Sequence, residues 1–188
     1  ETETNKRVSY RQQPLALLIT KKGTYSMSTI ATMSPASRNS LLRLSVATGL
    51  IIGAADMIIY NWLVISVLVG IPFISLYQYI ASGALGESAF AGGIATAFIG
   101  VLFHFLISIV VAGVFILGVD RIPLLRRHIT PGSLLYGFGV FIVMNMIVTP
   151  LSATPPIPAP TTQELILIIL DHLLFYGLLL GILVRRNI

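Results

Sequence analysis

Four long apolar runs, separated by short polar or proline-containing segments, dominate the pattern of the chain. Each run has the roughly 20 residues that cross a hydrocarbon core of about 30 Å. Thr161, followed by Glu164 in a capping-box pattern, is expected to start the last helix. The pattern predicts an all-α membrane protein, a four-transmembrane-helix bundle, with spans over residues 46–70, 93–119, 132–153 and 164–184.

Composition supports this interpretation, because the chain of 188 residues is 55% hydrophobic and only 10% charged. Soluble domains carry about 25% charged residues, so lipid must cover much of the exterior. The net charge of +5 does not indicate a nucleic-acid partner, since the basic residues lie in the first 43 positions and beside the apolar runs. Those positions suit anionic lipid headgroups. The absence of cysteine excludes disulfides and thiolate metal sites.

The arginines also predict the topology. They lie before the first run, in the loop of residues 120–128 and after the last run, whereas residues 71–92 and 154–163 contain no lysine or arginine. Cytoplasmic loops of membrane proteins are enriched in these residues. Both termini are therefore expected in the cytoplasm.

A short helix is predicted after the first run, which Pro72 ends. Apolar residues recur at helical spacing over residues 73–84, opposite Ser75, Gln78 and Ser82. This pattern predicts a short interfacial helix on the outer surface, between the first two spans, with its tyrosines at headgroup level. A re-entrant segment is the alternative.

The first 44 residues differ from the rest of the chain. Their apolar patch, residues 15–19, is shorter than the hydrophobic region of a secretory signal. We expect a basic, cytoplasmic and partly disordered tail over residues 1–44, with Met27 or Met33 as the natural start. The bundle is expected over residues 45–188.

Each run carries small or polar residues on one face. In lipid, such residues hold helices together by close approach and hydrogen bonds, so these faces are expected to meet. Two small-residue motifs, Gly49 with Gly53 and Gly177 with Gly181, are expected to make contacts within the bundle. The four faces are Gly49, Gly53, Asp56 and Tyr60; Thr96, Gly100, His104, Ser108 and Ala112; Ser133, Gly137, Phe141, Asn145 and Thr149; and Glu164, Asp171, Leu178 and Arg185.

Five polar groups from the four runs lie near one depth of the bilayer, and we name them the midplane cluster: Asp56, His104, Asn145, Asp171 and His172. At 1.5 Å per residue, Asp56 lies roughly 15 Å and the others roughly 18–21 Å from the cytoplasmic ends of the runs. An aspartate at the bilayer centre costs at least about 2.5 kcal/mol, which makes these groups candidates for function. Because adjacent residues are about 100° apart around a helix, Asp171 and His172 are expected to face different neighbours, one of them in a partner subunit.

Three interpretations of the midplane cluster stay open. Its members hydrogen-bond one another and fix the helix register, or they line a path for protons, ions or small solutes. Alternatively, His104 and His172 bind haem or a (bacterio)chlorophyll-type pigment as axial ligands. A zinc site would need a third strong ligand, and the spacing matches no zinc motif.

Enzyme motifs are missing from the sequence, which has no P-loop, dinucleotide fingerprint, HExxH or nucleophile elbow. The leading hypothesis is an accessory or structural subunit of a larger membrane complex, such as an energy-converting one, because the chain has little mass outside the membrane. A small transporter or proton-conducting protein is the second hypothesis. A haem- or pigment-binding membrane protein is the third.

Several short segments resemble the YagU-like proteins, a group of bacterial inner-membrane proteins of unknown function. The resemblance covers roughly residues 45–186 and implies a four-helix protein of a bacterial inner membrane. It assigns no role to His104 or Asn145, although both lie in the matching segments. Those segments are residues 76–83, 90–93, 103–107, 134–137, 144–145 and 149–152.

Overall fold

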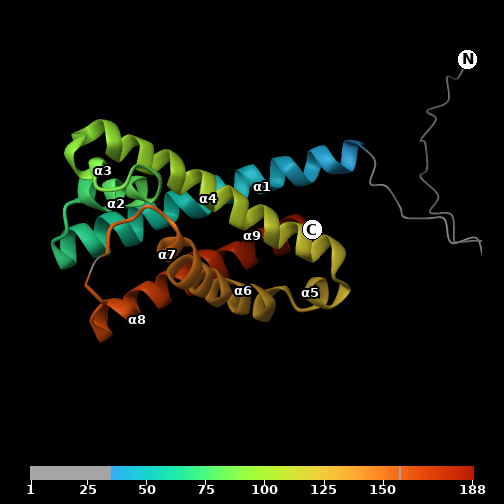
Figure 1. The fold of residues 1–188 in the computed structure, drawn as a ribbon. Coiled ribbons are helices and arrows are strands. Elements are labelled where there is room, and N and C mark those ends of the chain that lie inside the picture. Colours follow the sequence, from blue (N-terminus) through green and yellow to red (C-terminus); the bar gives the residue numbers. More distant parts are fainter. Residues whose placement is uncertain (1–34, 157) are drawn as a thin grey trace, which may run out of the picture. The chain divides into compact units, whose positions relative to one another are not determined.

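A computed structural model of the chain describes residues 35–156 and 158–188, which form helices and no strand (Figure 1). The expected tail covers residues 1–44, and its part up to residue 34 lies outside the described residues. The first helix already begins at Pro35.

Four spans within the described residues are long and apolar enough to cross a membrane, which confirms the predicted all-α four-helix bundle. The first span consists of α1 (Pro35–Ala55) and η1 (Asp56–Val69), and the second of α4 (Gly93–Arg121). The third consists of α6 (Ile129–Val143), η2 (Met144–Val148) and α7 (Thr149–Leu151). The fourth consists of α8 (Thr162–Asp171), η3 (His172–Leu179) and α9 (Leu180–Asn187). The connecting helices are α2 (Phe73–Leu85), α3 (Ser88–Ala91) and α5 (Pro123–Arg127).

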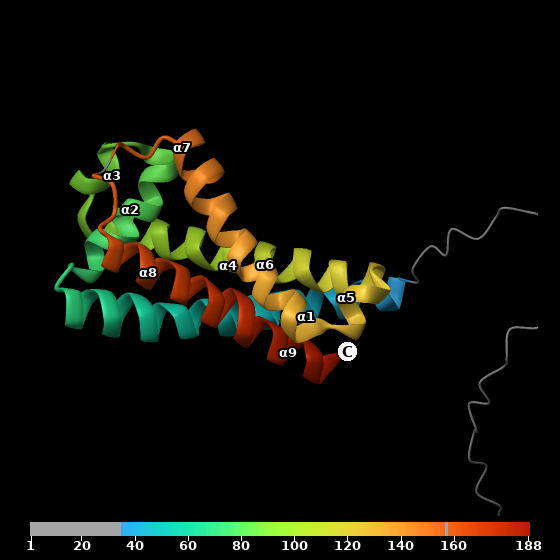
Figure 2. The ribbon, with the colours of Figure 1, turned by 90° about the horizontal axis from the view of Figure 1, so that it is seen from below.

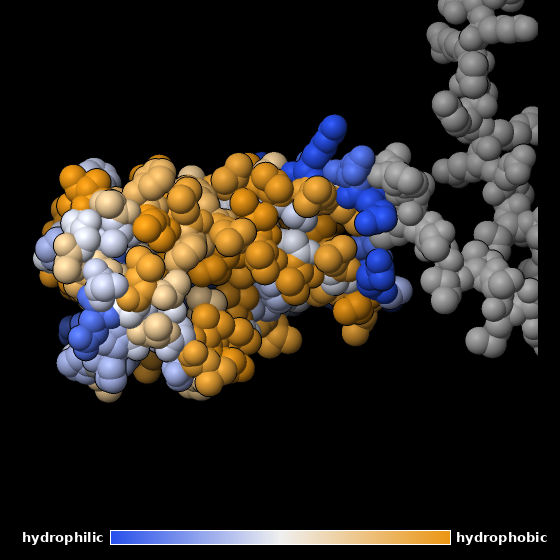
Figure 3. Space-filling view, turned by 45° about the horizontal axis from the view of Figure 1, so that its top comes forward, coloured by the Kyte–Doolittle hydropathy of each residue, from blue (hydrophilic) through white to orange (hydrophobic). Residues whose placement is uncertain are grey.

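The exterior of the spans is apolar, as a multi-pass membrane protein requires. Large side chains such as Ile94 and Leu135 are exposed at 76% and 74%, and apolar residues cover the middle of the molecule in Figure 3. Arginines gather at one end, which we name the basic end, where α1 begins, α5 lies and α9 finishes. Lipid is therefore the natural environment of this surface.

The four spans form two tightly packed pairs. In the first pair, α1 lies so close to α4 that a Cβ atom on Gly49 would stand 2.8 Å from a backbone nitrogen of α4. In the second pair, a Cβ atom on Gly137 of α6 would stand 2.7 Å from the backbone nitrogen of Gly177 in η3, and a Cβ atom on Gly181 would overlap the Ser133 side chain of α6. Both small-residue motifs thus serve contacts inside the bundle.

An apolar core joins the two pairs toward the basic end. It contains Ile52, Phe115, Ile116 and Val119 from the first pair, and Phe175, Leu180 and Val184 from the second. Beyond this core, α6 leans away from α8 toward α2 and α3 (Figure 2). The two helix pairs are therefore joined by apolar side chains toward the basic end, and they are further apart toward the opposite end.

The short helix α2 is present, but its orientation differs from the expectation. Gln78 and Ser82 are buried rather than turned to water, and Tyr77 is 1% exposed rather than at the surface. The Gln78 amide donates to the Gly93 carbonyl oxygen at 3.1 Å. A Cβ atom on Gly100 of α4 would overlap the Tyr77 carbonyl oxygen. Because the Gln78 amide finds its partner on α4, α2 packs against α4 with this polar face buried rather than turned to water.

Three of the four spans change from α to π winding near their middle. The π segments begin at Asp56, Met144 and His172, at or beside members of the midplane cluster. Irregular winding of this kind is frequent at functional sites. The apolar pattern of the four runs did not predict this change of winding.

Candidate functional site

A cavity of about 460 Å³ lies where the two pairs separate. This volume falls in the range of small-molecule sites, about 300–1,000 Å³. Its lining comes from all four spans and from α2, and includes all five members of the midplane cluster. Tyr79 lines it from α2, and partial burial raises the pKa of this phenol, so the hydroxyl stays a neutral hydrogen-bond donor.

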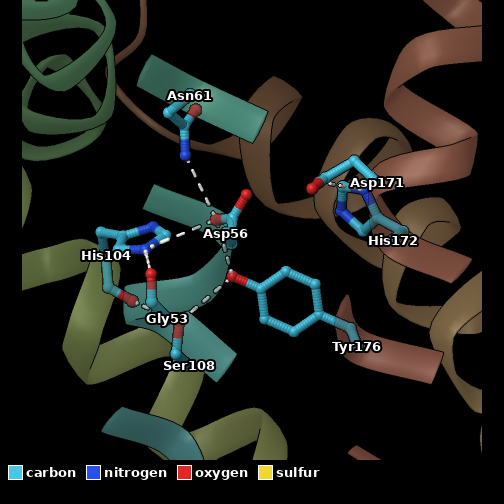
Figure 4. A network of polar contacts seen from close by, with 8 residues as sticks. All are labelled: Gly53, Asp56, Asn61, His104, Ser108, Asp171, His172 and Tyr176. Carbon is cyan, nitrogen blue, oxygen red and sulfur yellow. Dashed lines mark hydrogen bonds and ion pairs between the residues drawn. The ribbon is translucent and has the colours of Figure 1, made fainter. Parts of the chain in front are cut away.

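Asp56 is the centre of the polar network on the first pair (Figure 4). The Asn61 amide donates to its Oδ2 at 3.2 Å, and the Tyr176 hydroxyl donates to the same oxygen at 3.4 Å. His104 Nε2 lies 3.4 Å from that oxygen and 3.0 Å from the Gly53 carbonyl oxygen. A span that changes its winding at Asp56 is thus tied to both α4 and η3.

Asp171 and His172 form the other side of the site (Figure 4). His172 Nδ1 lies 2.9 Å from the Ile168 carbonyl oxygen and 3.2 Å from Asp171 Oδ2. The imidazole packs edge-on against Phe141 of α6, whereas Asp171 turns toward Asp56. The two adjacent residues therefore face different neighbours, and both of those neighbours lie within this chain.

The carboxyl groups of Asp56 and Asp171 face each other across the seam between the two helix pairs (Figure 4). Asp56 is 4% exposed and Asp171 is 6% exposed. The Oδ1 atom of each has no hydrogen-bonding partner among the described residues. Two carboxyl groups in this position form a hydrogen bond only when a proton lies between them.

The structure brings four of the five expected residues together and separates the fifth. Asn145 is exposed on the cavity wall, and its amide donates to the Phe141 carbonyl oxygen of its own helix at 2.9 Å. Tyr176 is a site residue that sequence reasoning missed. Its position next to Gly177, in the small-residue motif of the last span, was the available signal.

The expected inward face of the last span was wrong except at Asp171. Glu164, Leu178 and Arg185 are exposed. For Leu178 and Arg185 the seven-residue spacing assumed α winding, but η3 is a π-helix with more residues per turn. Glu164 lies in the first turn of α8, where its carboxylate accepts from the Thr161 backbone in the capping box. The buried residues after Asp171 are instead Phe175, Tyr176, Gly177, Leu180, Gly181 and Val184.

The two histidines do not fit a shared haem or pigment. His172 Nε2 has no hydrogen-bond partner among the described residues, as an axial ligand requires, but His104 turns its Nε2 to the Gly53 carbonyl oxygen. Asp56 and Tyr176 lie between the two imidazoles (Figure 4). Among the described residues, no group of three or more His, Asp or Glu side chains is arranged to hold a metal ion.

No protein-family model, curated protein or solved structure matches the chain. The chemistry of the site therefore rests on its own geometry.

Proposed function

We propose that this chain is a small membrane transport protein, which passes protons or exchanges them for a solute at the carboxyl pair of Asp56 and Asp171. The observation that carries the proposal is this pair, which lies between two separately packed helix pairs at the wall of a cavity. Ionisable groups inside a membrane bundle mark proton and ion pathways in other proteins.

The chemistry of the pair suits proton exchange. Two ionised carboxylates at close range repel each other, and burial removes the water that would screen them. Such a pair holds one proton between its members and titrates as a unit. No lysine or arginine is found among the described residues that line the cavity, so a proton or an arriving cation is the natural counter-charge.

Proton flux into liposomes tests the proposal. Vesicles with an entrapped pH-sensitive dye and an inside-negative potassium diffusion potential should acidify faster with the protein than without it. We expect Asp56→Asn and Asp171→Asn to abolish this flux, because an amide does not exchange a proton. His104→Ala and His172→Ala should lower the flux, because each removes an imidazole that contacts one of the two carboxyl groups. An Asp56→Glu variant, which keeps an acid, should retain part of the flux and thereby show that the loss is not one of folding.

Matched controls come from the basic end. Asp120→Asn and His128→Ala make the same chemical changes at positions that do not line the cavity, and both should keep the parent rate. An inactive parent protein, or unchanged flux in Asp56→Asn, His104→Ala and His172→Ala, would end the proposal.

A second candidate is an accessory subunit of a larger membrane complex, for example an energy-converting one. Its support is the shortness of the described connections between the spans, residues 70–92, 122–128, 152–156 and 158–161, which form no separate domain. Native gel electrophoresis after mild solubilisation tests it. Migration only as a free monomer or a small homo-oligomer would exclude this candidate.

The arrangement of arginines supports a location with both termini in the cytoplasm. The resemblance to the YagU-like proteins supports the bacterial inner membrane. In this orientation the cavity lies on the outer side of the apolar core.

A further inference from the structure

Exposed lining residues on α4 and η2 indicate that the cavity opens between these two helices. Two hydrogen bonds frame this opening: toward the basic end the Tyr136 hydroxyl donates to the Val111 carbonyl oxygen at 2.8 Å, and at the far end the Ala153 amide donates to the Gly83 carbonyl oxygen at 3.0 Å. Between these bonds the walls are mostly apolar, and Asn145 and Thr149 of the third span are the polar exceptions. The lining residues there are Phe103, Leu106 and Ile107 of α4, and Val140, Met144 and Val148 of the third span.

This opening reaches the lipid-facing surface. Leu106 lines the cavity and is nevertheless 58% exposed, and Val148 on the facing wall is 40% exposed. In a bilayer, acyl chains rather than water lie against side chains at this depth. A molecule that enters here must be soluble in lipid.

The inner end of the cavity has the opposite character. Asp56 and Asp171 line it, each more than nine-tenths buried and each with an Oδ1 atom that has no partner among the described residues. Tyr60 and Tyr176 also line this end, and the Tyr176 hydroxyl donates to Asp56 Oδ2. Both histidines beside the pair already have backbone partners. His104 is held at the Gly53 carbonyl oxygen, and His172 at the Ile168 carbonyl oxygen. A carboxyl pair that holds one proton carries one net negative charge.

From this geometry we infer that the cavity binds a monovalent amphiphilic organic cation, which enters from the lipid between α4 and η2 and displaces the proton of the Asp56–Asp171 pair. The inference rests on the proposed transport function and names its substrate class. The charge balance is one cation bound for one proton released. Apolar walls would hold the body of the ligand, and the carboxylates its charge.

Tetraphenylphosphonium and tetraphenylborate test the inference, because they have nearly the same shape and opposite charge. Equilibrium binding is measured to the full chain in lipid nanodiscs, with empty nanodiscs as the background. We expect saturable binding of one tetraphenylphosphonium per chain, release of about one proton in weakly buffered solution, and no saturable binding of tetraphenylborate. Asp171→Asn should weaken cation binding at least about tenfold, and Asp120→Asn should leave it unchanged.

The lateral opening is tested separately from the carboxyl pair. Leu106→Trp should slow association of tetraphenylphosphonium several-fold, because it fills the opening and leaves the carboxyl groups intact. Leu102→Trp is the matched control. It lies one turn earlier on the same face of α4, is 52% exposed and does not line the cavity.

The outcomes separate this inference from the proposed function. Proton flux with no saturable binding of tetraphenylphosphonium overturns the inference and leaves proton transport standing. Equal binding of the cation and the anion, or equal binding by the parent protein and Asp171→Asn, also overturns it. Cation binding without proton flux, measured both without and with a gradient of tetraphenylphosphonium across the vesicle membrane, supports the site and refutes transport.

Discussion

Close packing of α6 against η3 at Gly137 predicts that a single methyl group will separate the second helix pair. A Cβ atom at this position would stand 2.6 Å from the His172 carbonyl oxygen, and 2.7 and 2.8 Å from the backbone nitrogen and Cα of Gly177. Ordinary contacts begin at 3.4 Å. The two helices must therefore move apart by about 0.6–0.8 Å, because backbone atoms of a helix do not swing aside as a side chain does.

The expected magnitude follows from two opposing effects. Overpacking of this kind costs about 1–3 kcal/mol, and replacing glycine by alanine inside a helix returns about 0.5–1 kcal/mol. Gly137→Ala should therefore destabilise the protein by about 1–2 kcal/mol, which lowers Tm by about 2–8 °C for a chain of this size.

Gly139→Ala provides the matched control on the same helix. A Cβ atom there has nothing within 4 Å, so the helix propensity acts alone, and Tm should rise by about 1–4 °C. Thermal unfolding in one detergent, followed by circular dichroism, measures both variants. If Gly137→Ala raised Tm as Gly139→Ala does, the close packing of the second pair would be refuted. Because the strained contact includes the His172 carbonyl oxygen, Gly137→Ala should also lower proton flux.

Two further predictions concern the ends of the spans. Thr161 and Glu164 form the expected capping box, so Thr161→Ala should cost about 1 kcal/mol and lower Tm by about 2–4 °C. Gln163→Ala, in the same helical turn, should leave Tm unchanged. Equal effects of the two substitutions would show that the cap does not stabilise the protein. Since the chain has no cysteine, single introduced cysteines report the topology. A membrane-impermeant maleimide should label Ala159→Cys in intact cells and His128→Cys only after lysis. The reverse pattern of labelling would show that the proposed orientation is inverted.

Regular α winding explains how much of the fold the sequence predicted. On α4, every fourth residue from Gly100 to Ala112 is small or polar, and all four positions of this row are buried, including His104 and Ser108. The face was predicted correctly because α4 is a continuous α-helix over its whole length. The apolar length of each run likewise sufficed to identify all four spans.

Where the prediction failed, the local winding or the tertiary contacts departed from the rule it used. Leu178 was expected inward from its spacing to Asp171, but the π winding of η3 turns it outward and brings Tyr176 to Asp56. Gln78 was expected in water because an isolated amphipathic helix turns polar groups there. In the protein its amide finds a backbone carbonyl of α4 instead. Neither effect is visible in the period of the residues alone.

The carboxyl pair also argues against a purely structural role for the midplane cluster. Close approach at Gly49 and Gly137 already fixes the register within each helix pair. A second carboxyl group adds a hydrogen bond between the pairs only when it shares a proton, and it adds repulsion otherwise. Asp56 also has enough donors without Asp171, since Asn61 and Tyr176 both donate to its Oδ2. The seam between the two helix pairs is thus held on one side by an apolar core, and on the other by the Tyr176–Asp56 hydrogen bond and by a carboxyl pair that attracts only when it shares a proton. Proton-linked exchange requires a contact that is stable in one protonation state and unstable in the other. The Asp56–Asp171 pair has this property.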